Sequence, residues 1–94
     1  MRFRIIQNKK ECFICKTTQN LHCNHIFFGV ANRKLSEMDG LKVYLCYEHH
    51  EGKTGVHNNR NLDLYLKKIA EKTYLHKYGK TKEEFIKRYG KNYL

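Results

Sequence analysis

Two pairs of potential metal ligands stand out in the sequence. Cys12 and Cys15 form a Cys-x-x-Cys pair, and Cys46 and His49 form a Cys-x-x-His pair further along the chain. The spacing lets both side chains of a pair turn toward one ion, and two such pairs make a tetrahedral site that suits Zn²⁺. Two buried thiols beside an unrelated histidine, or a disulfide, are the alternatives. We expect a structural zinc ion at these four residues.

Length and composition favour a metal over a disulfide. A chain of 94 residues forms one small domain, whose core alone gives marginal stability, and metal binding is coupled to folding. No apolar run is long enough to span a membrane, and the N-terminal residues lack the apolar region of a signal peptide. We therefore expect a protein of the reducing cytoplasm, where closely spaced cysteines bind metal. Cys23 is expected to be a small buried residue on a strand.

A second group of polar side chains lies near these pairs in the sequence. Asn24 and His25 lie in an apolar stretch, His50 follows the proposed zinc ligand directly, and His57 comes after a glycine-bounded loop at 52–55. Because neighbouring strand residues point to opposite faces, Asn24 and His25 approach a common ion only at a strand end or a bend.

Each histidine also has a plain structural interpretation. His25 alone is consistent with a buried, hydrogen-bonded histidine, and His50 alone with a surface residue. We expect His22 and His76 to be structural or to face solvent.

The charge of the chain points to a polyanionic partner. Lysine and arginine number 19 against 9 acidic residues, for a formal net charge of +10. Such a balance favours nucleic acid, since nonspecific affinity comes from summed phosphate contacts. Arg33, Lys34 and Lys53 could hold phosphates, although each is individually consistent with a solvated charge.

The pattern of the chain predicts an α+β fold in a single domain, residues 1–94. Residues 1–60 would form a zinc-stapled core and residues 61–94 a helical extension. The alternation of apolar residues and the turn signals predict strands at 2–6, 21–28 and 41–45 and a short helix at 31–38, with the last two strands pairing as an antiparallel hairpin. A helix could begin at residue 47. A longer helix should begin with Asn61 as its N-cap and end near Gly79, and a capping box at Thr81 should open another that ends at Gly90.

The sequence resembles the HNH endonucleases of the ββα-metal fold. The resemblance rests on Asn24-His25-Ile26, the strand at 41–45 and Cys46-x-x-His49-His50. More narrowly, the Cys-x-x-Cys knuckle, the stretch at 26–37, Gly55-Val-His and the closing segment at 85–94 are similar to small phage-associated members. The resemblance covers residues 12 to 94.

The resemblance implies hydrolysis of a DNA phosphodiester bond with one divalent metal. His25 stands at the position of the general base, and an imidazole suits this task because its unperturbed pKa of about 6.5 leaves it largely neutral near pH 7. His50 stands at the position of a metal ligand. Asn24 stands where the family usually has an Asp or His ligand, and His57 would be a third ligand or a phosphate contact. The ion would be Mg²⁺ or Mn²⁺, with Ni²⁺ or Zn²⁺ as alternatives.

The family also has a middle asparagine, which orients the loop that carries the base. No asparagine stands there in this sequence, and Asp39 or Asn32 would take its place. The resemblance further implies a phage or prophage protein in the cytoplasm of a bacterial host, with a homodimer or a phage protein as possible partners. Two other functions stay open: a zinc-dependent DNA-binding module with a decayed catalytic site, and an accessory protein that binds another protein through its C-terminal helices.

Overall fold

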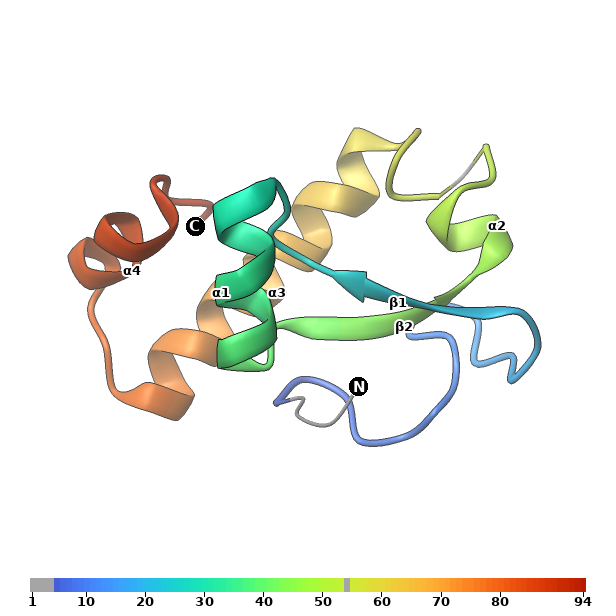
Figure 1. Cartoon of the computed structure of the whole chain (residues 1–94), viewed down its shortest axis with the longest axis horizontal. Coiled ribbons are helices and arrows are strands. Elements are labelled where there is room, and N and C mark those ends of the chain that lie inside the picture. The colour runs from blue at the N-terminus through green and yellow to red at the C-terminus, as the bar shows by residue number, and fades with distance from the viewer. Residues whose placement is uncertain (1–4, 54) are drawn as a thin grey trace.

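The computed structural model describes residues 5–53 and 55–94. The elements in these residues are β1 (Leu21–His25), α1 (Val30–Asp39), β2 (Lys42–Cys46), α2 (Tyr47–His50), α3 (Arg60–Tyr78) and α4 (Lys82–Tyr89). The predicted α+β class is confirmed, and the described residues form four helices around a small two-stranded sheet (Figure 1). In the described part of the chain, no helix is both long and apolar enough to cross a membrane.

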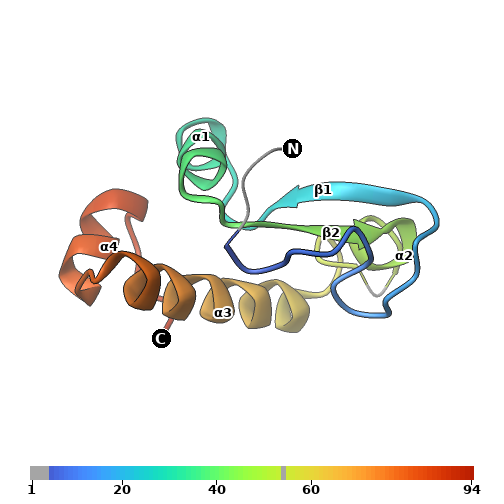
Figure 2. The ribbon, with the colours of Figure 1, turned by 90° about the horizontal axis from the view of Figure 1, so that it is seen from below.

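The sheet lies between two helices. β1 and β2 pair antiparallel, from Leu21 opposite Cys46 to His25 opposite Lys42. Figure 2 shows α1 over one face of the sheet and α3 under the other. Directly paired residues of an antiparallel ladder share a face, so His25 and Lys42 lie on the α1 side and Asn24 lies on the opposite side. The predicted hairpin is confirmed, and α1 lies within its connection.

The first predicted strand, at 2–6, is wrong for the residues that can be described. Ile5 and Ile6 form a bend, and residues 2–4 lie outside the described residues. The segment is tied to the rest of the chain by irregular hydrogen bonds instead. The Ile5 N–H donates to the Gly40 carbonyl at 3.1 Å, and the Gln7 side chain accepts from the Tyr44 N–H at 2.8 Å.

The strand predicted at 21–28 ends at His25, because a serine side chain forms hydrogen bonds with the backbone that follows. The buried Ser36 hydroxyl donates to the Phe27 carbonyl at 2.8 Å and accepts from the Phe27 N–H at 3.2 Å. These bonds turn the chain into α1, whose observed range is one residue longer at each end than the predicted 31–38. The strand predicted at 41–45 is shifted by one residue, to Lys42–Cys46.

The C-terminal helices follow their local signals closely. α3 begins two residues earlier than predicted, because Asn59 rather than Asn61 is the N-cap and accepts from the Leu62 N–H at 3.2 Å. The capping box at Thr81 is confirmed. Gly79 and Gly90, with φ of 61° and 88°, end the two helices in the left-handed conformation that glycine adopts without strain.

An aromatic cluster fixes α4 and the C-terminal segment to the β1–α1 connection. The fully buried Phe27 ring lies 5.3 Å from Phe85, 4.7 Å from Tyr89 and 5.4 Å from Tyr93, between centroids. Since these rings come from segments far apart in the sequence, the cluster closes the core at one end of the molecule. The backbone only two residues beyond His25 is therefore held firmly.

Asp39, the last residue of α1, joins α1 to α4. Its carboxylate accepts two hydrogen bonds from the Arg88 guanidinium, at 2.7 and 2.8 Å, and one from the Tyr89 hydroxyl at 2.6 Å. Burial and the bond to Asp39 raise the pKa of Tyr89, which stays a neutral donor. Because the carboxylate is mostly buried, the three bonds form a charge-assisted network rather than a surface ion pair.

We predict that Asp39→Ala lowers the free energy of unfolding by about 2–3 kcal/mol, because it removes charge-assisted hydrogen bonds and leaves Arg88 without its partner. Urea unfolding followed by circular dichroism, with zinc present, measures the loss. Glu83→Ala is the control: Glu83 is an exposed acidic residue in the first turn of α4, so its replacement should change stability by about 0.5 kcal/mol or less. An equal effect of the two substitutions would show that the Asp39 network adds nothing to the free energy of unfolding.

Candidate metal and catalytic site

The four predicted zinc ligands lie together at one end of the sheet. Cys46 Sγ lies 3.2 Å from His49 Nδ1, Cys12 Sγ lies 3.7 Å from the same nitrogen, and Cys15 Sγ lies 3.7 Å from Cys46 Sγ. All four ligand atoms lie within 4.8 Å of one another. We refer to these four residues as the knuckle cluster.

These distances suit a tetrahedral ion. Zinc at 2.3 Å from sulfur and about 2.0–2.1 Å from nitrogen places two sulfur ligands about 3.8 Å apart, and a sulfur and a nitrogen ligand about 3.6 Å apart. The observed ligand–ligand distances of 3.7, 3.7 and 3.2 Å lie close to these expected distances. The residues present therefore fit a structural zinc ion, and the four cysteines of the chain form no disulfide.

The first pair is shaped by a tight turn that docks on β2. The Lys16 N–H donates to the Cys12 carbonyl at 2.9 Å, and the Cys12 N–H donates to Thr17 at 2.8 Å. Lys16 has a φ of 68°, a left-handed conformation that reverses the chain. The Phe13 N–H donates to the Tyr44 carbonyl at 2.8 Å, which fixes the turn beside β2. Cys46 and His49 come from the end of β2 and from α2.

The electrostatics of the knuckle cluster favour a thiolate. Burial acts to raise the pKa of Cys12, but hydrogen bonds from the backbone at Cys15, Cys46 and Ile14 outweigh it and lower the pKa to about 6. Cys12 is thus largely ionised at neutral pH, which is the form that binds metal. Burial raises the pKa of Cys46, and the neighbouring thiols add to the rise.

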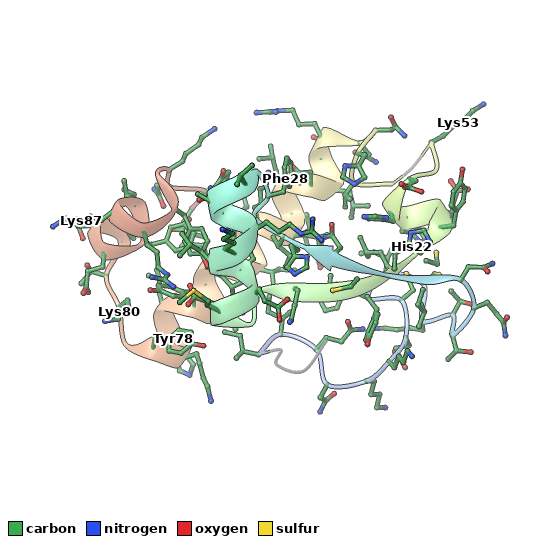
Figure 3. All side chains as sticks on the ribbon, viewed as in Figure 1. His22, Phe28, Lys53, Tyr78, Lys80 and Lys87 are labelled. Carbon is green, nitrogen blue, oxygen red and sulfur yellow. The ribbon has the colours of Figure 1, made fainter. Side chains whose placement is uncertain are left out.

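His50 lies between two other imidazoles. Its Nδ1 lies 3.0 Å from Nδ1 of His22, and its Nε2 lies 3.3 Å from Nε2 of His57. Burial, followed by the charges of His57 and His22, lowers the pKa of His50, so the ring is neutral at pH 7 and keeps a lone pair for a metal. His22, expected to be structural or to face solvent, therefore lies at the candidate site (Figure 3).

His57 reaches His50 because the loop after α2 folds back tightly. At Gly55, a Cβ atom would lie 2.8 Å from the His50 carbonyl carbon and 2.9 Å from the Glu48 carbonyl oxygen. Glycine is needed for this close backbone approach. The Val56 N–H then donates to the His49 carbonyl at 2.9 Å, and Val56 is buried, which fixes the residue before His57.

A cavity of about 260 Å³ brings most of the predicted catalytic residues together. We call it the His25 cavity, and its lining residues are Cys23, Asn24, His25, Phe28, Arg33, His50 and His57. β1 ends at His25, so Asn24 and His25 border one cavity although they belong to opposite faces. That both side chains approach a common ion at this strand end stays a prediction.

The lining of the His25 cavity offers imidazole nitrogens and the Asn24 amide oxygen as ligands. Among the described residues that line it, none is a carboxylate. This donor set fits a divalent ion that accepts nitrogen ligands, such as Ni²⁺ or Zn²⁺, better than Mg²⁺, which prefers oxygen.

His25 is oriented by an acidic residue of α1. Its Nε2 lies 2.8 Å from Glu37 Oε1, and the other Glu37 oxygen accepts a hydrogen bond from the fully buried ammonium of Lys42. These bonds, first to Lys42 and then to His25, lower the pKa of Glu37 to about 2. An ionised carboxylate can only accept a hydrogen bond, so Nε2 carries the proton as the donor and Nδ1 is the imidazole nitrogen with a free lone pair.

The predicted phosphate-binding residues do not form one group. Arg33 borders the His25 cavity and, with Lys34, a larger groove of about 720 Å³ along α1 that His25 also borders. Lys53 projects away from the molecule beyond α2 (Figure 3). The expectation that Cys23 is buried is wrong: it is exposed, because α1 covers only the other end of that face of the sheet (Figure 2).

The two candidates for the middle asparagine have other partners. Asp39 binds Arg88 and Tyr89, and the Asn32 side chain donates to the Tyr89 carbonyl at 3.2 Å. The side chain that fixes the backbone after His25 is Ser36, as described above.

Sequence reasoning missed His22, Ser36, Glu37 and Lys42 at this site. The sequence held one signal for Lys42 and Glu37. In an alternating strand, Lys42 falls on the same face as its antiparallel partner His25, and a buried lysine requires an acidic partner such as Glu37.

Comparison of the chain with protein-family models, with curated proteins and with solved structures finds no match.

We predict that Cys46→Ser abolishes zinc binding, because it removes a central ligand of the knuckle cluster. A structural zinc ion is worth about 10 kcal/mol or more in small domains, so cooperative unfolding should also be lost. Zinc content by atomic absorption and thermal unfolding by circular dichroism measure both effects. Cys23→Ser makes the same chemical change at an exposed cysteine outside the cluster and should retain zinc. Full zinc content in Cys46→Ser would contradict the site.

Proposed function

We propose that the protein is a metal-dependent endonuclease of the HNH type, which hydrolyses DNA phosphodiester bonds, with β1, β2 and α2 as its ββα-metal core. The observation that carries the proposal is the His25 cavity. An imidazole oriented by a carboxylate, two further imidazoles and an arginine surround a space of about 260 Å³ beside a metal-binding knuckle.

The substrate would be held by positive charge. Arg33 borders the cavity and Lys34 lies exposed on the same helix, so both could contact phosphate oxygens next to His25. The formal net charge of +10 supplies the general attraction to DNA.

The divalent ion would be held by Asn24, His50 and His57, with the two imidazoles binding through Nε2. When bound, such an ion supplies positive charge that stabilises the scissile phosphate and the leaving oxygen. The neutral state of His50 leaves its lone pair available for this role.

His25 would act as the general base. Its Nε2–H donates to Glu37, and Nδ1 takes a proton from a water molecule that attacks phosphorus. The P–O bond on the far side breaks, and the leaving oxygen gains a proton from solvent. Glu37, held in turn by the buried Lys42, is a positioning residue: it keeps the ring in the tautomer that the base requires.

We predict that His25→Ala abolishes nicking of supercoiled plasmid while zinc content and fold are kept. The assay is run with Mn²⁺, with Mg²⁺ and with EDTA. His76→Ala is the matched control, because His76 is exposed on α3 and outside the His25 cavity. Full nicking by His25→Ala would show that His25 is not the general base.

We also predict that Glu37→Gln slows nicking by about 10²-fold or more. The glutamine oxygen would face the Lys42 ammonium, so its NH₂ group would face His25 Nε2 and force the proton to Nδ1. A base held in the wrong tautomer loses its activity although the geometry is intact, by about 10⁴-fold in serine proteases.

Nitrogen-15 chemical shifts of His25 measure the tautomer directly, beside the nicking rate. Glu83→Gln, which changes an exposed glutamate of α4, should alter neither measurement. An unchanged tautomer in Glu37→Gln would show that Glu37 does not position the base.

A second candidate function is a zinc-dependent DNA-binding module without catalysis. It is favoured by the neutral Asn24 and by the lack of a carboxylate among the described lining residues of the His25 cavity. DNA binding with no cleavage in Mn²⁺, Mg²⁺, Ni²⁺ or Zn²⁺ would select this function.

A further inference from the structure

The two ring nitrogens of His50 face two different groups of ligands. Nε2 faces His57 at 3.3 Å on the side of the His25 cavity, and Nδ1 faces His22 at 3.0 Å. A neutral imidazole carries one proton and therefore has a lone pair on only one of its nitrogens at a time. The ring can bind a metal on either side, but binding on both sides at once would require the imidazolate anion.

A third potential ligand lies beside these two rings. One ring nitrogen of His22, one of His50 and a carboxylate oxygen of Glu51 lie within 4.8 Å of one another, and the Nδ1 atoms of the two rings lie 3.0 Å apart. His22 comes from β1, where it pairs with Leu45, and the other two residues come from α2 and the residue after it. The ring of Tyr47, 6.3 Å away between centroids, packs edge-on against His22. Neither His22 nor Glu51 borders the His25 cavity.

This ligand set has a definite chemistry. Two imidazoles and one carboxylate form a three-ligand zinc site that leaves a fourth position open. Two nitrogen ligands of one tetrahedral zinc lie about 3.3 Å apart, close to the observed 3.0 Å between His22 and His50. The third ligand atom, a carboxylate oxygen of the exposed Glu51, lies within 4.8 Å of the other two.

We propose that His22, His50 and Glu51 form a second binding position for zinc or a similar borderline divalent ion. An ion at this position competes with an ion in the His25 cavity, because both need the lone pair of the same His50 ring. The position itself stands independently of the proposed function. Only its effect on activity, inhibition by excess zinc, rests on the proposed nuclease reaction.

The binding test uses His57→Ala, which removes the imidazole that faces His50 Nε2 on the side of the His25 cavity. The protein is loaded with zinc at the knuckle cluster and titrated with Zn²⁺ in the absence of DNA, with nitrogen-15 shifts of His50 as the readout. We expect a further ion bound to Nδ1 of His50. When His22→Ala is added to this variant, only the knuckle ion should stay bound. Adding the control His76→Ala instead should not change the number of bound ions. A His57→Ala protein that binds no further ion, or binds it equally without His22, would overturn the proposal.

The wild-type protein gives an independent measurement if His57→Ala folds poorly. At saturating Zn²⁺, part of the protein should have His50 coordinated through Nδ1, and Glu51→Gln should lower that share. Nε2 coordination alone at all zinc concentrations would contradict the second position.

The activity test separates this proposal from the proposed function. With Mn²⁺ present, added Zn²⁺ should inhibit plasmid nicking by the wild-type protein, and His22→Ala should relieve the inhibition relative to its own rate without zinc. Equal inhibition in both proteins would overturn the competition. A protein that binds zinc at Nδ1 of His50 but does not nick DNA would refute only the nuclease.

Discussion

The rest of the site depends on one constraint, the convergence of Cys12, Cys15, Cys46 and His49 on a common point. A two-stranded sheet is at best marginally stable alone, so its strands need further stabilising contacts. The knuckle cluster, whose four residues could hold a metal ion, lies where β2 passes into α2. It also sets a direction: residues that follow one another in a helix point about 100° apart, so fixing His49 toward the thiols turns His50 away from them. The position of the imidazoles around His50 therefore follows from the direction in which His49 points.

The opposite end of the molecule fixes the other half of the site. Phe27, buried among aromatic rings and bonded through its backbone to Ser36, holds the chain two residues beyond His25. The same turn starts α1, which brings Glu37 over the face of the sheet that His25 shares with Lys42. The fully buried ammonium of Lys42 is tolerated because Glu37 is its partner. The ion pair that makes this burial possible is thus also the one that orients His25.

Sequence predicted best what depends on near neighbours. The capping box of α4, the glycines that end α3 and α4, and the spacing of the zinc pairs are all encoded within a few residues. The roles of Glu37 and Lys42 could not be predicted this way, because they depend on which face of the sheet α1 covers. The same limit explains Cys23: an apolar strand suggests burial, but α1 does not extend over that part of the sheet.

The candidate site lies between these two anchors, and this position has a physical consequence. His50 and His57 are positioned from the knuckle end, whereas His25 and Arg33 are positioned from the aromatic end, and the strand β1 connects the two (Figure 1). A disturbance of the knuckle cluster should therefore displace His50 and His57, the proposed metal ligands, relative to the proposed base while the His25–Glu37 pair stays intact. A disturbance of the aromatic cluster should do the reverse. A cavity of about 260 Å³ leaves little room for either displacement, so its chemistry depends on both ends of a very small core.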